Sequence, residues 1–442
     1  MICHEIQGKM ERDQTNSRVT AVEAPTVLLT ETVRWPTVAL LAIALAKNGS
    51  KVSAVCSRRH PLLKTRAVRK IFPYSSLNPL ASLRAAIEAT DPRIIIPCDD
   101  RAVQHLHELH ALTRDWGTSG NKIAALIENS LGMPASYPIV YDRNKFLKIA
   151  REEGLRVPDT EPISTVADLR SWKMRHAFPF VLKADGTFCG HGVKVAQTLD
   201  QAGRFLLELT RYYNAGRAVK RMCVNRDKFW LRPWWNGIKP AISVQSYIHG
   251  SPANCGVVCW KGKVLAGIGV EAVGTAGPTG PASVVRVVDN PDMMVSAERI
   301  AGRLGLSGFF GLDFIIEAES GLTYLIEINP RPTRVSCFQL GKGRDPVGAL
   351  CAQLTNQPYR ERPPVTQQNM VAYFPDAWNP RSEFLASSFH DIPEGEPDLI
   401  QELLKPWPPK GLFWHMVNQV DRLKVFLRNS DSKREPGTPD KK

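Results

Sequence analysis

The chain has 442 residues, of which 43% are hydrophobic, 23% charged and 8% aromatic. These values are ordinary for globular proteins, so they exclude a collagen-like, coiled-coil or wholly disordered chain. The longest apolar run, Val38 to Ala46, is far shorter than the roughly 20 residues that a membrane-spanning helix needs. Residues 1–24 mix charges of both signs and lack an apolar segment, so a secretory signal is not expected. These observations favour a soluble, cytoplasmic protein without a membrane partner.

The charge is strongly basic and unevenly distributed. Lys and Arg number 57 against 43 Asp and Glu, which gives a formal net charge of +14. Residues 51–70 contain seven basic and no acidic residues, and residues 203–239 contain nine basic residues against Glu208 and Asp227. Such stretches indicate either an anionic partner or a solvated basic face, and the sequence leaves both open.

The nine cysteines are scattered along the chain, and none of them has the Cys-x-x-Cys spacing of a zinc site. A disulfide framework would be denser and would use an even number of cysteines. The pattern therefore predicts reduced thiols that are mostly buried.

The N-terminal part alternates short apolar strands with helices. The order strand, helix, strand predicts βαβ units with a parallel sheet, and so a doubly wound domain over about residues 25–130. The turn at residues 31–36 lacks the glycines that bring a dinucleotide pyrophosphate to a helix N-terminus, so this domain is not expected to bind a dinucleotide. The expected strands are residues 26–30, 51–56 and 94–96, and the expected helices are residues 37–47, 79–90 and 100–112.

Strands dominate the chain after a helix expected at residues 144–153. They are joined by one further helix at residues 297–304, which indicates a mixed α+β region rather than a continued parallel sheet. The expected strands are residues 179–184, 193–197, 241–248, 253–260, 264–270, 311–317, 323–328 and 369–374.

A glycine-rich segment from Asp185 to Gly192 joins two of these strands. Because no helix follows, it is neither a Walker A loop nor a dinucleotide-binding turn, and it is expected to be a hairpin. Its backbone N–H groups could fold over phosphates, with Lys183 on the preceding strand supplying a positive charge. A plain turn is the other interpretation, and the loop alone does not decide between them.

The strand that ends in Glu327-Ile328-Asn329-Pro330-Arg331 carries isolated polar residues among apolar ones. Residues two apart share a face of a strand, so Glu327, Asn329 and Arg331 are expected on one side and Ile326 and Ile328 on the core side. Asp313 on the neighbouring strand can join the polar side. Two carboxylates and an amide are oxygen ligands suited to Mg²⁺, whereas the alternative is an exposed ladder of charges.

Together these residues resemble the ATP-grasp superfamily, and most closely its carboxylate–amine ligases and the synthetase domains of carbamoyl phosphate synthase. The resemblance covers about residues 25–375. It rests on Arg143 at the head of a helix, Lys183 before the glycine loop, the segment from Val244 to Ile248 followed by Gly250, and the Glu-x-Asn-Pro-Arg strand end, which is the most specific part.

This resemblance implies an α/β and α+β fold with five segments. A Rossmann-like domain is expected at residues 25–140, followed at residues 141–375 by an ATP-grasp domain of two α+β subdomains with ATP between them. A helical C-terminal extension is expected at residues 376–428. Residues 1–24 and 429–442 are expected to be disordered ends.

The resemblance also implies which residues form the site. Arg331 and Lys183 would be catalytic, with Arg331 steadying the transferred phosphoryl group. Asp313, Glu327 and Asn329 would hold Mg²⁺, for which Mn²⁺ could substitute. The residues expected to bind ATP are Arg143, Lys183, Gly186, Gly190, His191, Gly192, Gln245, Ser246, Tyr247 and Ile248.

The implied reaction is attack by a substrate carboxylate on the γ-phosphate of ATP, followed by displacement of phosphate by an amine or another nucleophile. Two other functions stay open. A non-catalytic ATP sensor is one, because the segment from Val244 to Ile248 and the residues just after it, here called the hinge, have Gln245 and Pro252 where the family commonly has acidic residues. Nucleic-acid binding is less expected and rests on the charge and on Phe229, Trp230, Trp234 and Trp235, which could instead pack a loop or an interface. A homodimer is compatible with the sequence.

Overall fold

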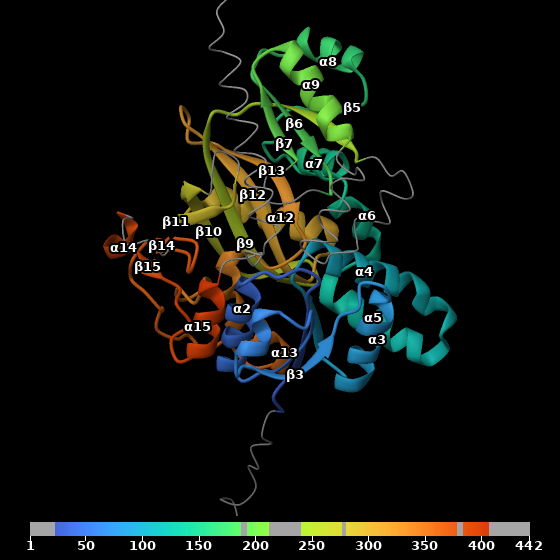
Figure 1. The fold of residues 1–442 in the computed structure, drawn as a ribbon, viewed down its shortest axis with the longest axis vertical. Helices are drawn as coiled ribbons and strands as arrows, with labels where there is room; N and C mark the ends of the chain where they lie inside the picture. The colour runs from blue at the N-terminus through green and yellow to red at the C-terminus, as the bar shows by residue number, and fades with distance from the viewer. Residues whose placement is uncertain (1–22, 187–191, 212–239, 276–279, 378–382, 406–442) are drawn as a thin grey trace, which may run out of the picture.

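The computed structural model describes residues 23–186, 192–211, 240–275, 280–377 and 383–405. Three sheets organise them, and Figure 1 shows the N-terminal sheet and its helices below the other two. The expected terminal segments 1–24 and 429–442, except for residues 23 and 24, lie outside the described residues. So does the aromatic cluster between residues 229 and 235.

The N-terminal sheet is parallel and has the order β3-β2-β1-β4. Side chains of β1 alternate between its two faces: Val27 and Leu29 pack toward α2, whereas Leu28 packs toward α3, α4 and α5. This is the doubly wound arrangement that the sequence predicted. The elements are β1 (Thr26–Thr30), α2 (Thr37–Lys47), β2 (Lys51–Cys56), β3 (Val68–Pro73), α3 (Pro79–Thr90), β4 (Ile94–Pro97), α4 (Asp100–Leu112), α5 (Gly117–Leu131) and α6 (Tyr137–Val140).

The small sheet is antiparallel and has the order β5-β8-β6-β7. It is covered by α8 and α9, whose apolar side chains form a separate core with Phe180, Leu182 and Val244. In Figure 1 it stands at the top of the molecule. Its elements are β5 (Thr160–Ile163), α8 (Val166–Lys173), β6 (Phe180–Ala184), β7 (Val193–Ala196), α9 (Leu199–Thr210) and β8 (Ile242–Ser246), and α7 (Arg143–Glu152) precedes it.

The large sheet has the order β13-β12-β9-β10-β11-β14-β15 and is antiparallel except for the last pair. Helices α7 and α12 pack on it around a core that includes Phe146, Met293 and Phe314. Its strands are β9 (Gly250–Trp260), β10 (Lys263–Thr275), β11 (Ala282–Val288), β12 (Gly308–Glu317), β13 (Thr323–Asn329), β14 (Met370–Ala372) and β15 (Phe389–His390). The helices in this part of the chain are α12 (Pro291–Leu304), α13 (Pro346–Thr355), α14 (Phe384–Ser387) and α15 (Pro397–Leu404), of which α15 packs on the N-terminal part.

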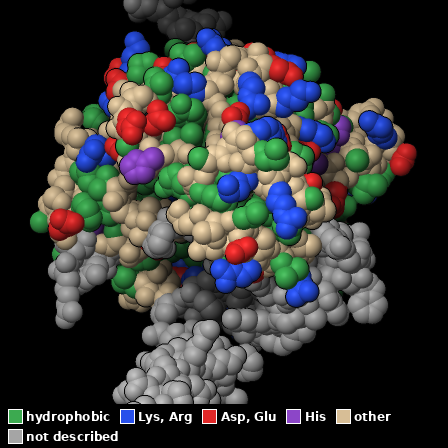
Figure 2. Space-filling view, turned by 90° about the horizontal axis from the view of Figure 1, so that it is seen from above, with side chains coloured by type: hydrophobic (Ala, Val, Ile, Leu, Met, Phe, Trp, Pro, Cys, Tyr) green, Lys and Arg blue, Asp and Glu red, His purple; other side chains and the backbone are tan. Residues whose placement is uncertain are grey.

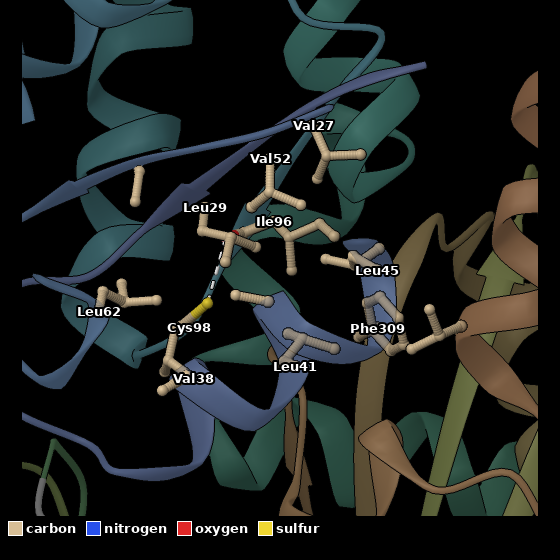
Figure 3. Packing of buried hydrophobic residues seen from close by; sticks show 14 of the residues in the cluster. Val27, Leu29, Val38, Leu41, Leu45, Val52, Leu62, Ile96, Cys98 and Phe309 are labelled. Carbon is tan, nitrogen blue, oxygen red and sulfur yellow. Dashed lines mark hydrogen bonds between the residues drawn. The ribbon is translucent and has the colours of Figure 1, made fainter. Parts of the chain in front are cut away.

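One hydrophobic core joins the N-terminal sheet to the large sheet. Figure 3 shows Leu41 and Leu45 of α2 beside Phe309 of β12, with Val27, Leu29 and Val52 above them. From the C-terminal end of the described chain, Leu399 and Leu403 of α15 belong to the same core, together with Val347 and Leu350 of α13. The N-terminal and C-terminal parts of the chain therefore pack as one unit.

On the face shown in Figure 2, Lys and Arg side chains are scattered among acidic and hydrophobic ones. The six cysteines within the described ranges are free, and five of them are buried, as predicted. No helix in the described part of the chain is long and apolar enough to span a membrane.

Candidate active site

A cavity of about 1070 Å³ opens where the three sheets meet. Its lining comes from the loop after β1, the N-terminus of α4, the start of α7, the hairpin after β6, strands β9 to β13, and the segment that follows β13. This volume suits a small-molecule ligand, and sites of this kind commonly form between domains. Most residues of the predicted metal and phosphate site face this cavity.

A β-bulge sets which side chains of β13 face the cavity. Asp313 pairs with Glu327, but the next residue of β12, Phe314, pairs with Leu325, so Ile326 is an extra residue. As a result Leu325 lies in the core, Ile328 lies in the core and at the edge of the cavity, and Ile326 lines the cavity beside Glu327. The prediction that Ile326 faces the core is therefore wrong, because it assumed unbroken alternation along the strand.

Asp313, Asn329 and Asn254 form a hydrogen-bonded group on β12, β13 and β9. Asn254 Nδ2 donates to Asp313 Oδ1 at 2.6 Å, and Asn329 Nδ2 donates to Asp313 Oδ2 at 2.9 Å. Burial, and next the charge of Glu327, raise the pKa of Asp313, although the two amides oppose the shift. The arrangement concentrates oxygen atoms and negative charge in a low-dielectric place, where a divalent cation would relieve the cost of burying them.

Arg143 lies between two carboxylates. It is the first residue of α7, which begins after Asp142, whose side chain accepts a hydrogen bond from Lys145 N. Arg143 Nη1 is paired with Asp185, and Nη2 lies 3.2 Å from Glu327 Oε1. Its Nε is buried and has no hydrogen-bond partner among the described residues. The guanidinium therefore keeps one buried donor without a partner among the described residues.

Lys183 on β6 is only 5% exposed, and its Nζ has no hydrogen bond or ion pair with another described residue. Burial, followed by repulsion from Arg143, lowers the pKa of Lys183 to about 8, while Glu327, Asp313 and Asp185 act in the opposite direction. A buried ammonium without a partner is costly. An anion such as a phosphate chain, placed against Lys183 and Arg143, would neutralise both positive charges, so these residues fit a nucleotide.

Arg331 follows β13 and connects the site to the N-terminal sheet. Its Nε lies 3.1 Å from Asp100 Oδ1 at the N-terminus of α4, and its Nη2 lies 3.2 Å from Asn329 Oδ1. Although burial alone would lower the pKa of Arg331, Asp100 and Asp313 raise it. The guanidinium is therefore held as a fixed cation between the segment after β13 and the N-terminus of α4.

Two glycines allow the segment after β13 to approach the large sheet closely. Gly256 of β9 and Gly311 of β12 are direct partners in the sheet. A Cβ at Gly311 would overlap Cγ2 of Thr333, and one at Gly256 would lie 2.6 Å from Thr333 Oγ1. The missing side chains thus set the position of the segment that carries Arg331.

Several predicted ATP-binding residues are not part of this lining. Gln245 is 2% exposed, and its Nε2 donates to Thr160 Oγ1 of β5 at 2.9 Å. The other hinge residues, Ser246, Tyr247 and Ile248, are also absent from the lining, as are Lys183 and Gly192, whereas Gly186 belongs to it. Gly190 and His191 lie outside the described residues.

Three polar residues of the site were missed by sequence reasoning, namely Asp100, Asp185 and Asn254. Asp185 directly follows β6, and Asp100 directly follows β4 and Cys98-Asp99, so both stand at a strand end, which is a usual place for functional side chains. Asn254 gave no such signal, because it lies in the middle of a long strand. Across the described ranges, no group of three or more His, Cys, Asp or Glu is placed to bind a metal; the predicted set has two carboxylates and one amide.

Comparison with sequences of known proteins gives a consistent result. Residues 229–335 match the family model of the ATP-grasp domain. The arginine-specific large chain of carbamoyl phosphate synthase from Geobacillus stearothermophilus is 22% identical over 209 residues, 47% of this chain. The large chain from Rubrobacter xylanophilus is 25% identical over 214 residues, 48% of this chain. The matched region spans 19% of the length of each of these relatives.

Comparison with solved structures supports the same fold. An N5-carboxyaminoimidazole ribonucleotide synthetase in complex with ADP has a TM-score of 0.54 at 14% identity, covering 77% of this chain and 80% of that one. The biotin carboxylase domain of a Hydrogenobacter thermophilus 2-oxoglutarate carboxylase, with MgADP and bicarbonate, has a TM-score of 0.53 at 13% identity, covering 77% and 71%. The chain is thus similar to ATP-grasp enzymes: its fold resembles theirs, and residues 229–335 match the model of the ATP-grasp domain.

Proposed function

We propose that this protein is an ATP-dependent ligase that activates a carboxylate as an acyl phosphate and transfers the acyl group to an amine or another nucleophile. The observation that carries the proposal is the meeting of Arg143, Glu327, Asp313 and Arg331 around one cavity between the sheets, with Lys183 buried close to them. Cations for phosphates and oxygen ligands for a metal thus lie next to each other. Phosphoryl transfer needs this combination of positioning and charge neutralisation more than it needs a proton-transferring residue.

ATP would lie between the small and large sheets. Lys183 and Arg143 would hold its phosphates, and Gly186 begins the hairpin that would cover them. Asp313, Glu327 and Asn329 would hold Mg²⁺, which when bound supplies charge neutralisation between the phosphate oxygens. In this arrangement Arg143 Nη2 gives up Glu327 and turns to phosphate, so the ion pair of the described structure is exchanged for two stronger charge contacts.

Arg331 would bind the attacking carboxylate and the transferred phosphoryl group. A guanidinium can donate two parallel hydrogen bonds to a carboxylate or phosphate, which fixes orientation as well as charge. Asp100 and Asn329 hold this guanidinium from two sides. It is therefore already oriented before substrate binds, and the reaction gains from that preorganisation.

The test is ADP release from ATP and Mg²⁺ across a panel of carboxylates and amines, with hydroxylamine added to trap an acyl phosphate as a hydroxamate. A ligase releases ADP only with its own carboxylate and forms the hydroxamate in equal amount. If ATP binds but no combination releases ADP, the protein is an ATP sensor and the proposal fails. Binding to an oligonucleotide that weakens steeply with salt would instead support the nucleic-acid function.

A further inference from the structure

The ion pair between Arg331 and Asp100 has a chemical counterpart in the two groups that a ligase joins. Arg331 is a cation suited to a substrate carboxylate, and Asp100 is an anion suited to a protonated amine. Their side chains come from the large sheet and from α4, 231 residues apart, yet Nε and Oδ1 are 3.1 Å apart within the same cavity. The two substrates would thus be placed side by side.

We propose, on the basis of the ligase function above, that Asp100 binds the ammonium group of a cationic amine substrate through Oδ2. Arg331 donates to the other oxygen, Oδ1, and no described residue forms a hydrogen bond with Oδ2. The Asp100 side chain is 45% exposed, against 19% for Arg331, so the free oxygen is reachable from the cavity. Asp100 lies in the first turn of α4, where the helix favours a negative charge.

The other carboxylates of the cavity are already engaged. Asp99 accepts hydrogen bonds from Thr32 N, Thr32 Oγ1 and Ala102 N, and it is buried. Asp185 and Glu327 are paired with Arg143, and both oxygens of Asp313 accept from amides. Asp376 is exposed, but its Oδ2 pairs with Arg334, not with Arg331. Asp100 is thus the carboxylate of the described lining that touches Arg331 and keeps a free oxygen.

The position also fits the order of the reaction. A carboxylate activated beside Arg331 presents its carbonyl carbon next to Asp100, so an amine held on Oδ2 starts within reach of it. The ammonium first releases one proton to solvent, because only the neutral amine has a lone pair. That lone pair forms the C–N bond, the C–O bond to phosphate breaks, and inorganic phosphate leaves with that electron pair. Protons lost by the nitrogen pass to solvent. Asp100 is a substrate-binding residue in this scheme, selecting for positive charge on the nucleophile.

The experiment compares a cationic alkylamine with hydroxylamine, which is largely uncharged at neutral pH, as nucleophiles for the same acyl phosphate. In Asp100→Asn the ratio of kcat/KM for the amine to that for hydroxylamine is expected to fall about tenfold to hundredfold, the range for loss of one charged hydrogen bond. The asparagine keeps an oxygen for Arg331 Nε and removes only the charge. Asp100→Glu, which retains the charge, should keep most of the preference.

Asp376→Asn is the matched control, because it removes an exposed carboxylate paired with a different arginine in the same cavity. Its ratio is expected to stay at the wild-type value. An unchanged ratio in Asp100→Asn, or an equal fall in both variants, overturns the inference. If the variant does not fold, a competition experiment with the wild type decides. A cationic alkylamine should inhibit the reaction of the amine substrate at least tenfold more strongly than an uncharged alcohol of the same shape. Equal inhibition by the two compounds overturns the inference. Absence of ADP release by the wild type would instead overturn the ligase function itself.

Discussion

Arg34 and Glu402 form an ion pair that joins the loop after β1 to the last described helix. Arg34 Nη2 lies 2.7 Å from Glu402 Oε1, and the two side chains are 8% and 17% exposed. Arg34 also lines the cavity, and its Nε donates to Arg59 O at 3.2 Å. The C-terminal helix α15 therefore supports one wall of the site from outside.

Glu402→Ala should destabilise this wall. Removing one partner of a largely buried, charged hydrogen bond is expected to lower the free energy of unfolding by about 1–3 kcal/mol, measured by urea denaturation. The KM for a substrate that binds against this wall of the cavity, next to Arg34, should also rise. Asp398→Asn, an exposed change in the same helix, is the control, and an equal loss of stability in both variants would contradict a specific role of the pair.

Glu327→Gln should abolish ADP formation. The change keeps the size of the side chain but removes a charge that both Arg143 and a bound metal would use. Circular dichroism should show an unchanged fold, because the side chain faces the cavity and not the core. Glu319→Gln, an exposed change in the turn between β12 and β13, should have no effect. Normal turnover in Glu327→Gln would remove the main metal assignment.

Arg331→Lys should leave the affinity for ATP nearly normal and should lower the rate of turnover by a factor of about 10² to 10³. Lysine keeps the charge, but it cannot hold two oxygens in the geometry of a guanidinium. The size of the effect is that of losing one positioned electrostatic donor. Single-turnover ADP release measures it, and a rate equal to that of the wild type would show that Arg331 is only structural.

ATP affinity should fall as the pH rises above about 8. Burial lowers the pKa of Lys183 to about 8, so the ammonium loses its proton above that pH unless a phosphate is bound. Phosphate favours the charged form, and the Kd for ATP should therefore rise by at most tenfold per pH unit above 8 and level off below it. Lys183→Met should bind weakly with no such dependence. An identical pH profile for both proteins would assign the change to another group.

The same shift has a consequence for stability without ligand. The unfolded lysine holds its proton up to its ordinary pKa, whereas the folded one releases it near 8. Between these values the unfolded state binds more protons, so the free energy of unfolding contributed by Lys183 rises with pH. The wild type should gain this contribution on going from pH 7 to pH 10 and Lys183→Met should not, which a pair of denaturation series would measure.

Gly311→Ala should reduce turnover more than stability. The added Cβ would overlap Cγ2 of Thr333 and shift the segment that carries Arg331. Adding Thr333→Ser removes that methyl group and should restore part of the activity, whereas Thr333→Ser alone should have little effect. If the double variant is as slow as Gly311→Ala, the close approach to Thr333 is not the cause.

Local sequence patterns predicted much of the fold. The first two strands and helices α2, α3 and α4 begin and end at the predicted residues, because each combines a continuous apolar pattern with clear turn residues, whereas helices α5 and α6 were not predicted. Strand β3 was missed because it is a short edge strand whose Arg69 and Lys70 are exposed, so its sequence resembles a polar loop. Helix α15 was placed only within a helical extension, since its apolar face is defined by packing on the N-terminal sheet.

The site was predictable only in part. The polar residues of β13 were visible because charged side chains stand out in an apolar strand. The bulge at Ile326 was not visible, since it depends on the pairing between β12 and β13 and not on the sequence of either strand. The contacts of Arg331 with Asp100 and of Arg143 with Glu327 join residues more than 180 positions apart, so only the folded chain brings them together.

The hydrophobic core that joins the N-terminal sheet to the large sheet should determine how the protein unfolds. Because α2, β12 and α15 bury their side chains in one cluster, the N-terminal and large sheets should lose structure in a single cooperative step. The small sheet has its own cluster and should open independently, with earlier amide exchange in β6 and β8 than in β1 and β12. A nucleotide held by Lys183 on one unit and by Glu327 on the other would merge the two transitions into one.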